Sequence, residues 1–313
     1  MCSNWSARLL SFLGKKVLKK LLFPEKQAIL FSFMKLSLLT LNLHTYQQHH
    51  RHCPFATMHH HEREVHIIAE AIAQLSIDVI CFQEVGEYLH DPITDPYGES
   101  PSNMAFRICK KLRHWGLWYH IHQDWSHIGF YRWREGTAIM SRYPMKHNFS
   151  AYVSADQRKD NYMSRNITVS CIDVPWFGLL HIANAHLSWA HHGFYQEYNN
   201  LKSLIHSRRH WGVRGDVIVG DFNAPAGEHA YNHIVRHAEY VDQYHELHPQ
   251  RFYQPSYQGQ IDGWKNFPPK RIDYIFKRNG SPMRINTMDV IFNNDYYPIV
   301  SDHFGYLAKF DMY

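Results

Sequence analysis

Apolar and polar residues follow one another along most of the chain in short blocks of strand and helix type. The apolar runs of strand length predict strands at Leu36–Leu43, Asp78–Gln83, Gly136–Ser141, Ile167–Val174, Gly178–His186, Val217–Gly220, Ile272–Phe276 and Val290–Phe292. Apolar residues at helical spacing predict helices at His61–Leu75, Ser102–Trp115, Tyr195–Trp211 and Ala226–His237. Strands mixed with helices in this way are typical of a layered α/β domain.

The first 35 residues follow a different pattern. Their apolar residues recur at helical spacing with lysines between them, at Leu9, Leu10, Phe12, Leu13, Val17, Leu18, Leu21 and Leu22. This pattern is typical of a basic amphipathic helix that contacts an anionic membrane surface. In the alternative interpretation, Met34 is the true start, because it leads directly into the first predicted strand. We expect a basic amphipathic leader over residues 1–35, with its place inside or outside the fold left open, and one domain over residues 36–313, which no linker or repeat divides.

The positive charge of the chain is concentrated in that leader. The whole chain has 33 basic and 28 acidic residues, a formal net charge of +5. Seven of the basic residues and one acidic residue lie in residues 1–35, so residues 36–313 carry 26 basic and 27 acidic groups, a net charge of −1. A nuclease normally contacts several backbone phosphates with Lys and Arg. The charge of the body therefore disfavours a nucleic-acid substrate without excluding it.

Cysteines and histidines give no sign of a structural metal site. Cys2, Cys53, Cys81, Cys109 and Cys171 form no CxxC pair, which favours reduced thiols in a cytoplasmic enzyme. The histidine-rich run His59–His66 is one residue too long for HExxH, so it is interpreted as an exposed surface. No run of 18 or more apolar residues indicates a membrane-spanning helix.

Polar residues of catalytic type lie at the ends of six strand-like runs. They are Asn42 and His44, Gln83 and Glu84, Asn184 and His186, Asp221 and Asn223, Asp273, and the segment 301–303 before an expected last strand. In open α/β sheets, functional groups gather where strands end in loops. Six endings that supply carboxylates, amides and histidines therefore predict an active site.

These segments resemble the endonuclease/exonuclease/phosphatase superfamily of metal-dependent phosphoesterases, which includes pancreatic deoxyribonuclease and neutral sphingomyelinases. The similar segments, in the order of the family, are LTLNLH (39–44), CFQEV (81–85), EGTAIMSRYP (135–144), NAHL (184–187), GDFNAP (220–225), RIDYIF (271–276) and SDHFG (301–305). The resemblance implies an α/β fold of four layers, an α/β/β/α sandwich in which two mixed β-sheets pack face to face.

The resemblance also implies which residues bind metal and water. Glu84, Asn42 and Asp302 would bind Mg²⁺ or Mn²⁺, because these ions prefer hard oxygen ligands. Asp221 would orient or deprotonate the attacking water, and Asn223 would hold a phosphoryl oxygen. For Asp302, a turn cap is the alternative.

Two histidines with acidic partners complete the implied site. His186 and His303 would be protonated and would donate to the phosphate oxygens from two sides. Glu135 would be the acidic partner of His186, and Asp273 that of His303. The alternatives are an ordinary Glu-Gly turn for Glu135 and an ion pair with Arg271 for Asp273.

Three further polar residues have less specific assignments. Gln83 is expected to support the metal site through hydrogen bonds, and Asn184 is interpreted as a strand residue. Arg165, in the segment MSRN, is left open between contact with the phosphate and a solvent-exposed position on a strand.

The substrate is narrowed by segments outside the shared motifs. Residues 122–133, 188–195 and 261–264 are rich in aromatic residues and histidine, which suit sugar rings or stacked bases at a pocket rim. A second group of segments resembles the bacterial branch that contains maltose 6'-phosphate phosphatase: WSHIGFYRWREGTAIMSRYP (125–144), HLSW (186–189) with QEY (196–198), IDGW (261–264) and PIVSDHFG (298–305). Members of that branch act on phosphorylated sugars inside the cell. We therefore expect a Mg²⁺-dependent enzyme that hydrolyses a small phosphomonoester, a sugar phosphate above all, by in-line attack of water. A metal-dependent endonuclease or exonuclease, a sphingomyelinase-like phosphodiesterase and a non-catalytic binding module are the alternatives.

Overall fold

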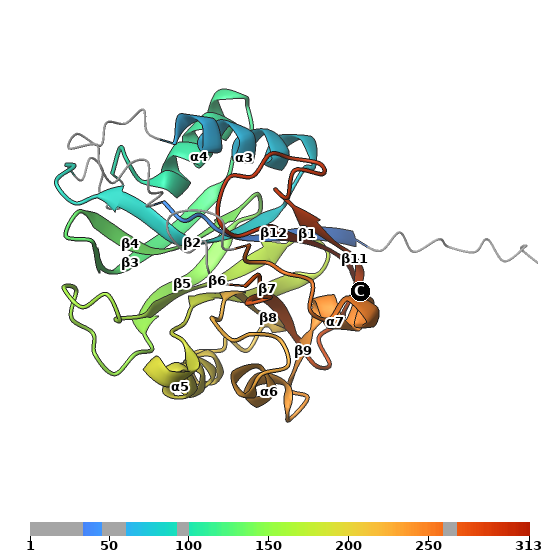
Figure 1. Cartoon of the computed structure of the whole chain (residues 1–313). Coiled ribbons are helices and arrows are strands. Elements are labelled where there is room, and N and C mark those ends of the chain that lie inside the picture. The colour runs from blue at the N-terminus through green and yellow to red at the C-terminus, as the bar shows by residue number, and fades with distance from the viewer. Residues whose placement is uncertain (1–33, 46–60, 93–99, 259–267) are drawn as a thin grey trace, which may run out of the picture. The chain divides into compact units, whose positions relative to one another are not determined.

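A computed structural model of the chain describes residues 34–45, 61–92, 100–258 and 268–313. The leader up to residue 33, Cys2, Cys53, the start of the histidine-rich run and residues 261–264 lie outside the described residues. The described part contains two six-stranded β-sheets with helices on their outer faces (Figure 1).

The first sheet has the strand order β11-β12-β1-β2-β4-β3. Its strands are β1 (Met34–Asn42), β2 (Val79–Tyr88), β3 (His120–Gly129), β4 (Trp133–Ser141), β11 (Met283–Ile291) and β12 (Gly305–Met312). β1 and β2 are parallel, and the other neighbours are antiparallel, so the sheet is mixed.

The second sheet has the strand order β5-β6-β7-β8-β10-β9. Its strands are β5 (Met145–Tyr152), β6 (Asn166–Val174), β7 (Gly178–His186), β8 (Val213–Asp221), β9 (Tyr240–Asp242) and β10 (Asp273–Arg278). Here β7 and β8 are the parallel pair, and the other neighbours are antiparallel.

Helices cover the outer face of each sheet and complete the four layers (Figure 1). α3 (Glu62–Gln74) and α4 (Met104–His114) pack on the first sheet, whereas α5 (Phe194–Ser207) and α6 (His229–Val235) pack on the second. The shorter elements are α7 (Gln243–Leu247) and two 3₁₀ turns at Ala190–His192 and Pro249–Arg251. The predicted sandwich of two mixed sheets is confirmed. None of the described helices is long and apolar enough to cross a membrane.

The sequence of β1 explains why its strand is buried on both faces. Leu36 and Leu38 belong to the core between the two sheets, whereas Leu39 and Leu41 belong to the core under α3 and α4. Because successive strand side chains point to opposite faces, a strand that lies inside a sandwich is apolar at nearly every position. This continuous apolar run is the signal by which the strand could be predicted.

The strands that the sequence did not predict lie at sheet edges. β3, β5 and β9 are edge strands, and β11, also at an edge, begins seven residues before the predicted Val290. Residues 122–133, expected at a pocket rim, form most of β3 and its turn into β4. An edge strand is partly exposed and needs no continuous apolar run, so its sequence looks like a loop.

The histidine-rich run differs partly from its prediction. His66 is exposed on α3, as expected, but His61 is buried immediately before that helix. His61 has a left-handed backbone conformation with φ 65° and stands at the N-cap position. Glu64 and Val65 are also buried, so the prediction of an exposed run is wrong at these two residues and at His61.

The described cysteines are buried thiols. Cys81, Cys109 and Cys171 are free and buried in the structure. Burial raises the pKa of the Cys171 thiol to about 11 and raises that of Cys81 further. Protonated thiols in the core are chemically inert, so these cysteines serve as packing residues.

Removing residues 1–33 is expected to leave the described fold intact. The pairing of β1 with β12 begins at Met34, and the described residues belong to one unit that begins there. The truncated protein should therefore show the same cooperative thermal unfolding as the full chain. A midpoint lowered by more than about 5 °C, which corresponds to roughly 2 kcal/mol in a domain of this size, would show that the leader packs on the domain.

Candidate active site

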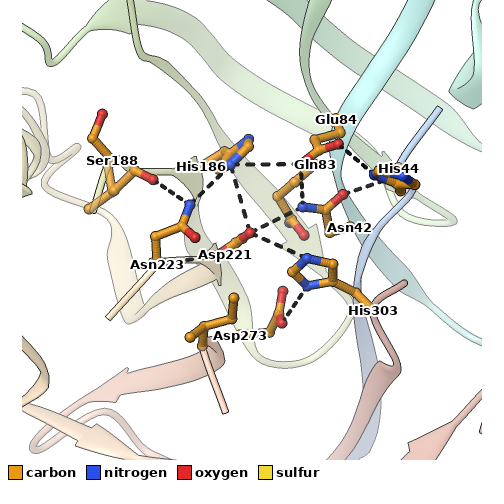
Figure 2. A network of polar contacts seen from close by, with 12 residues as sticks. Asn42, His44, Gln83, Glu84, His186, Ser188, Asp221, Asn223, Asp273 and His303 are labelled. Atoms are coloured by element: carbon orange, nitrogen blue, oxygen red, sulfur yellow. Dashed lines mark hydrogen bonds and ion pairs between the residues drawn. The ribbon is translucent and has the colours of Figure 1, made fainter. Parts of the chain in front are cut away.

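Seven of the nine predicted site residues gather in one place in Figure 2. The other two contact the histidines of this group: Glu135 lies 3.8 Å from His186, and Asp302 lies 3.9 Å from His303. Asn42, His186 and Asp221 are the last residues of β1, β7 and β8. Since β1 with β2, and β7 with β8, are parallel pairs, their carboxyl ends meet at the same side of the sandwich. Asp273 begins β10 directly opposite Asp221 and thereby enters the same site.

A β-bulge in β2 presents Glu84 to the site. The register of β2 against β4 shifts between Phe82 and Val85, and Glu84 has φ 47°, in the left-handed region. Thr45 donates its hydroxyl to the Glu84 carbonyl at 2.6 Å and accepts a bond from the Gly86 amide at 3.1 Å. A Cβ at Gly86 would stand 2.8 Å from Thr45, so this clamp requires glycine.

The metal-ligand candidates form a tight polar network (Figure 2). Asn42 Nδ2 donates to Glu84 Oε1 at 3.0 Å and to Asp221 Oδ2 at 3.1 Å. His44 Nδ1 lies 3.5 Å from Glu84 Oε2 and 3.5 Å from Asp302 Oδ1. Burial would raise the pKa of Glu84, but the hydrogen bond and the charge of His44 outweigh it and lower that pKa to about 2. The Glu84 carboxyl is therefore ionised at every physiological pH, as a candidate metal ligand should be.

The donor set fits a divalent cation. Two groups of described residues have ligand atoms within 4.8 Å of one another, Glu84 with His186 and Asp221, and Asp221 with Asp273 and His303. Asp302 belongs to neither group and contacts His44. Burial and the neighbouring Asp273 carboxylate raise the pKa of Asp221 to about 8, which reflects crowded buried negative charge. A bound cation would relieve this crowding, and carboxylate and amide oxygens suit Mg²⁺ or Mn²⁺.

His303 is held in place by Asp273. Its Nδ1 lies 2.8 Å from Asp273 Oδ2, which also accepts the Ser256 hydroxyl at 2.6 Å. Burial alone would lower the pKa of His303, but the carboxylates of Asp273 and Asp302 raise it well above its ordinary value. The imidazole is therefore protonated at neutral pH, and its Nε2 lies 3.9 Å from Asp221 Oδ2. The alternative for Asp273 fails, because Arg271 pairs with Asp242 at 2.7 Å.

His186 differs from its prediction. Its Nδ1 lies 3.8 Å from Glu135 Oε1, a distance for an ion pair and not for a hydrogen bond. Burial and the positive charge of Arg165 lower the pKa of His186 well below its ordinary value. His186 is therefore neutral here, and the expectation that both histidines are protonated is wrong for it.

Glu135 lies within a strand and contacts two histidines. It belongs to β4, where a Cβ at Gly136 would stand 1.9 Å from the Asp124 carbonyl oxygen. The Glu-Gly pair is thus a close approach between β3 and β4, not a turn. Glu135 Oε2 lies 3.6 Å from His127 Nε2, so its carboxylate lies between His127 and His186.

The GDFN segment places Asp221 and Asn223 through its backbone. Gly220 has φ 134°, and a Cβ there would stand 2.0 Å from the Ala185 carbonyl oxygen. The Asn223 amide donates to Asp221 Oδ1 at 2.8 Å. Asn223 Nδ2 donates to the Leu187 carbonyl at 2.9 Å and lies 3.3 Å from His186 Nε2. The motif therefore fixes the distance between the two side chains that its resemblance assigns to water and phosphate.

Gln83 and Asn184 connect the two sheets. Gln83 Nε2 donates to Asn184 Oδ1 at 2.7 Å, and Asn184 Nδ2 donates to the carbonyls of Phe82 and Ala138. The strand role expected for Asn184 agrees with these bonds. Gln83 was expected to support the metal site through hydrogen bonds. Its side chain bonds instead to Thr40, Cys81 and Asn184, none of which is a candidate metal ligand.

Sequence reasoning assigned no role to two histidines of the site. His44 contacts both Glu84 and Asp302, and His127 is buried against Glu135. The signal for His44 was its place two residues after Asn42 at the end of the same strand. His127 lies in an edge strand that resembles a loop in the sequence, so nothing marked it.

Comparison with protein families gives one match over most of the chain. The sequence pattern of the "Endonuclease/Exonuclease/phosphatase family" matches residues 60–303. This range includes every predicted site residue except Asn42. No curated protein matches the chain.

Several solved structures share the fold. A family protein from Leptotrichia buccalis C-1013-b is 24% identical with a TM-score of 0.71, and the match covers 88% of this chain and 100% of that one. A mannosyl-6-phosphatase from Bacteroides thetaiotaomicron VPI-5482 is 14% identical with a TM-score of 0.58, covering 88% and 99%. The TDP2 protein of D. rerio, complexed with a single-strand DNA product, is 17% identical with a TM-score of 0.57, covering 89% and 99%.

Proposed function

Because the chain belongs to the endonuclease/exonuclease/phosphatase family of metal-dependent phosphoester hydrolases, we propose that it removes the phosphate group from a small phosphorylated substrate, a sugar phosphate above all. The observation that carries the proposal is the convergence of Asp221, Asn223 and the His303–Asp273 pair beside the acidic cluster around Glu84. In this arrangement Asp221 can accept a proton, Asn223 can donate a hydrogen bond as a neutral amide, and His303 can donate one as a positively charged imidazolium. These are the groups that hydrolysis of a phosphomonoester needs.

Each residue has a distinct task in the proposed mechanism. Asp221 orients the attacking water and accepts its proton. Asn223 Nδ2 donates a hydrogen bond to a phosphoryl oxygen, and His303 Nε2 donates to an oxygen on which negative charge develops. His303 keeps its proton because Asp273 accepts from Nδ1. The neutral imidazole of His186 donates one further hydrogen bond.

The metal is proposed to be Mg²⁺ or Mn²⁺. Glu84, Asn42 and Asp302 would hold it, with the oxygen donors that these ions prefer. A bound divalent ion would supply positive charge that neutralises the phosphate and lowers the pKa of the attacking water. It would also counter the repulsion that raises the pKa of Asp221.

Charge and exposed aromatic residues support a small substrate. Residues 36–313 carry a net charge of −1, which gives little general attraction for the phosphate backbone of a nucleic acid. Three aromatic side chains are exposed after β7 and α7: Trp189 in the loop after β7, Tyr195 in the first turn of α5, and Tyr253 after the 3₁₀ turn Pro249–Arg251. Aromatic faces of this kind suit the rings of sugars. One protein of the same fold is a mannosyl-6-phosphatase, which is consistent with the proposal. At 14% identity this similarity establishes only the shared fold.

A nuclease is the second candidate, because a protein of the same fold was solved with a single-strand DNA product. Exposed aromatic side chains can also stack on bases. A sphingomyelinase-like activity would depend on the leader, which we propose contacts anionic membranes. We propose a cytoplasmic location, which the buried free thiols support.

Release of inorganic phosphate from a panel of sugar phosphates tests the proposal. With Mg²⁺ present, we expect at least one sugar phosphate to be hydrolysed far faster than supercoiled plasmid is nicked. EDTA should stop the reaction. Plasmid nicking without phosphate release would establish the nuclease instead, and phosphocholine release from vesicles that requires residues 1–33 would establish the sphingomyelinase-like activity.

A further inference from the structure

Arg165 lies next to the active site at the start of β6. The antiparallel register pairs Ile167 with Ala185, which places Arg165 beside the residues that follow His186. The backbone of Arg165 is fixed by Ser154, whose hydroxyl accepts from the Arg165 amide at 2.8 Å. Only 6% of the residue is exposed. The alternative of a solvent-exposed position on a strand is therefore wrong for Arg165.

The guanidinium of Arg165 has no acidic partner among the described residues. Its Nε donates to Ser188 Oγ at 3.4 Å, and neither terminal nitrogen has a hydrogen bond or ion pair within the described part of the chain. Burial raises the pKa of Glu197 and the nearby charge of Arg165 counters this rise, but Glu197 makes no ion pair with the guanidinium, and both of its oxygens accept from Ser188, at 2.8 and 2.9 Å. A buried cation without a direct ion-pair partner costs free energy, so an anion is expected to join it.

Two other buried arginines show how this chain normally compensates such a charge. Arg134 pairs with Glu87, and Arg271 pairs with Asp242 at 2.7 Å. Neither of these pairs includes a predicted site residue. Arg165 is the exception among the three, and it is the one beside the catalytic residues.

Arg165 lies close to two residues that are proposed to contact the phosphate, His186 and Asn223. Its charge is close enough to lower the pKa of His186. Asn223 Nδ2 bonds the Leu187 carbonyl, so Asn223 and Arg165 both contact the short segment that follows β7. The candidate phosphoryl donor Asn223, just after β8, and the guanidinium of Arg165, just before β6, therefore contact neighbouring residues of the same segment.

We propose that Arg165 binds a non-bridging oxygen of the substrate phosphate, an inference that rests on the proposed function. The planar guanidinium can give two parallel hydrogen bonds to a phosphate, and the anion would supply the missing charge partner. Ser188, itself fixed by Glu197, holds the guanidinium through Nε and leaves the terminal nitrogens for the ligand.

Calorimetric binding of inorganic phosphate, in the presence of Mg²⁺, tests this role without relying on turnover. Arg165→Met keeps most of the side-chain volume but removes the charge and the donors, so the affinity for phosphate should fall about 10–100-fold. Arg165→Lys keeps the positive charge but not the paired hydrogen bonds of the guanidinium, so its affinity for phosphate should fall less than that of Arg165→Met. Arg209→Met is the matched control, because it removes an arginine that pairs with Asp216 near the opposite end of β8. Its phosphate affinity should equal that of the wild type.

The outcomes separate this inference from the proposed function. Unchanged phosphate affinity in a folded Arg165→Met protein overturns the role of Arg165, even when the wild type hydrolyses sugar phosphates. If Arg165→Met does not fold, the same comparison is made with Arg165→Lys, where unchanged affinity and KM for the phosphomonoester overturn the role. A wild type that binds phosphate through Arg165 but cleaves only phosphodiesters contradicts the proposed function and leaves the inference standing.

Discussion

Glu84→Gln should lower metal-dependent phosphate release by at least about 10³-fold. The substitution keeps the shape of the side chain but removes a charge that is present at every physiological pH, since the pKa of Glu84 is about 2. Charge stabilisation by a bound metal ion is worth several kcal/mol in reactions of this type, and each 1.36 kcal/mol corresponds to a factor of about ten in rate. The same change should weaken the binding of Mn²⁺ measured by calorimetry.

Glu70→Gln is the matched control for this experiment. Glu70 lies on α3 and accepts a hydrogen bond from Gln74 on the exposed face, so its loss removes one carboxylate without touching the site. Its activity and its affinity for Mn²⁺ should stay at the wild-type level. If Glu84→Gln binds Mn²⁺ as tightly as the wild type, the metal is held elsewhere and the assignment of Glu84 is wrong.

The fold could be predicted where strands are buried on both faces. β1, β2, β4, β6, β7, β8 and β10 are interior strands, and each carries an apolar run that the sequence shows. The edge strands β3 and β5 place many polar residues in partly exposed positions. Their pairing depends on the neighbouring strand and not on their own composition, so the sequence of the segment alone does not reveal it.

The candidate site was predicted through its motifs, and the structure brings those residues together. The motifs predict which residues lie together because most of them stand at or near strand ends, and the parallel pairs β1–β2 and β7–β8 align those ends. Protonation was less predictable. The pKa of His186 depends on burial and on Arg165, which lies on another strand, whereas that of His303 depends on Asp273 and Asp302. Tertiary packing decides which charged groups lie beside each histidine, and the spacing of residues along the chain does not reveal these neighbours.

His303→Ala should lower kcat about 10²–10³-fold and change KM little. The contact of a protonated donor with the phosphoryl oxygens strengthens as negative charge develops, so its loss acts on the transition state and not on binding of the substrate. Asp273→Asn should have a smaller effect on kcat at neutral pH. His206→Ala, on the exposed side of α5 where the histidine contacts Glu239, is the matched control and should keep full activity.

The pH dependence and the double variant decide whether Asp273 acts through His303. Because Asp273 raises the pKa of His303, the protonated imidazole is present below that raised pKa and is lost as the pH rises through it. Removing the Asp273 charge should therefore move the alkaline fall in kcat to lower pH. Combining Asp273→Asn with His303→Ala should cost almost nothing beyond His303→Ala alone, since an orienting acid has no task without its histidine. Losses that multiply in the double variant would mean that Asp273 acts independently, for example on the metal. An unchanged kcat in His303→Ala would remove the proposed mechanism altogether.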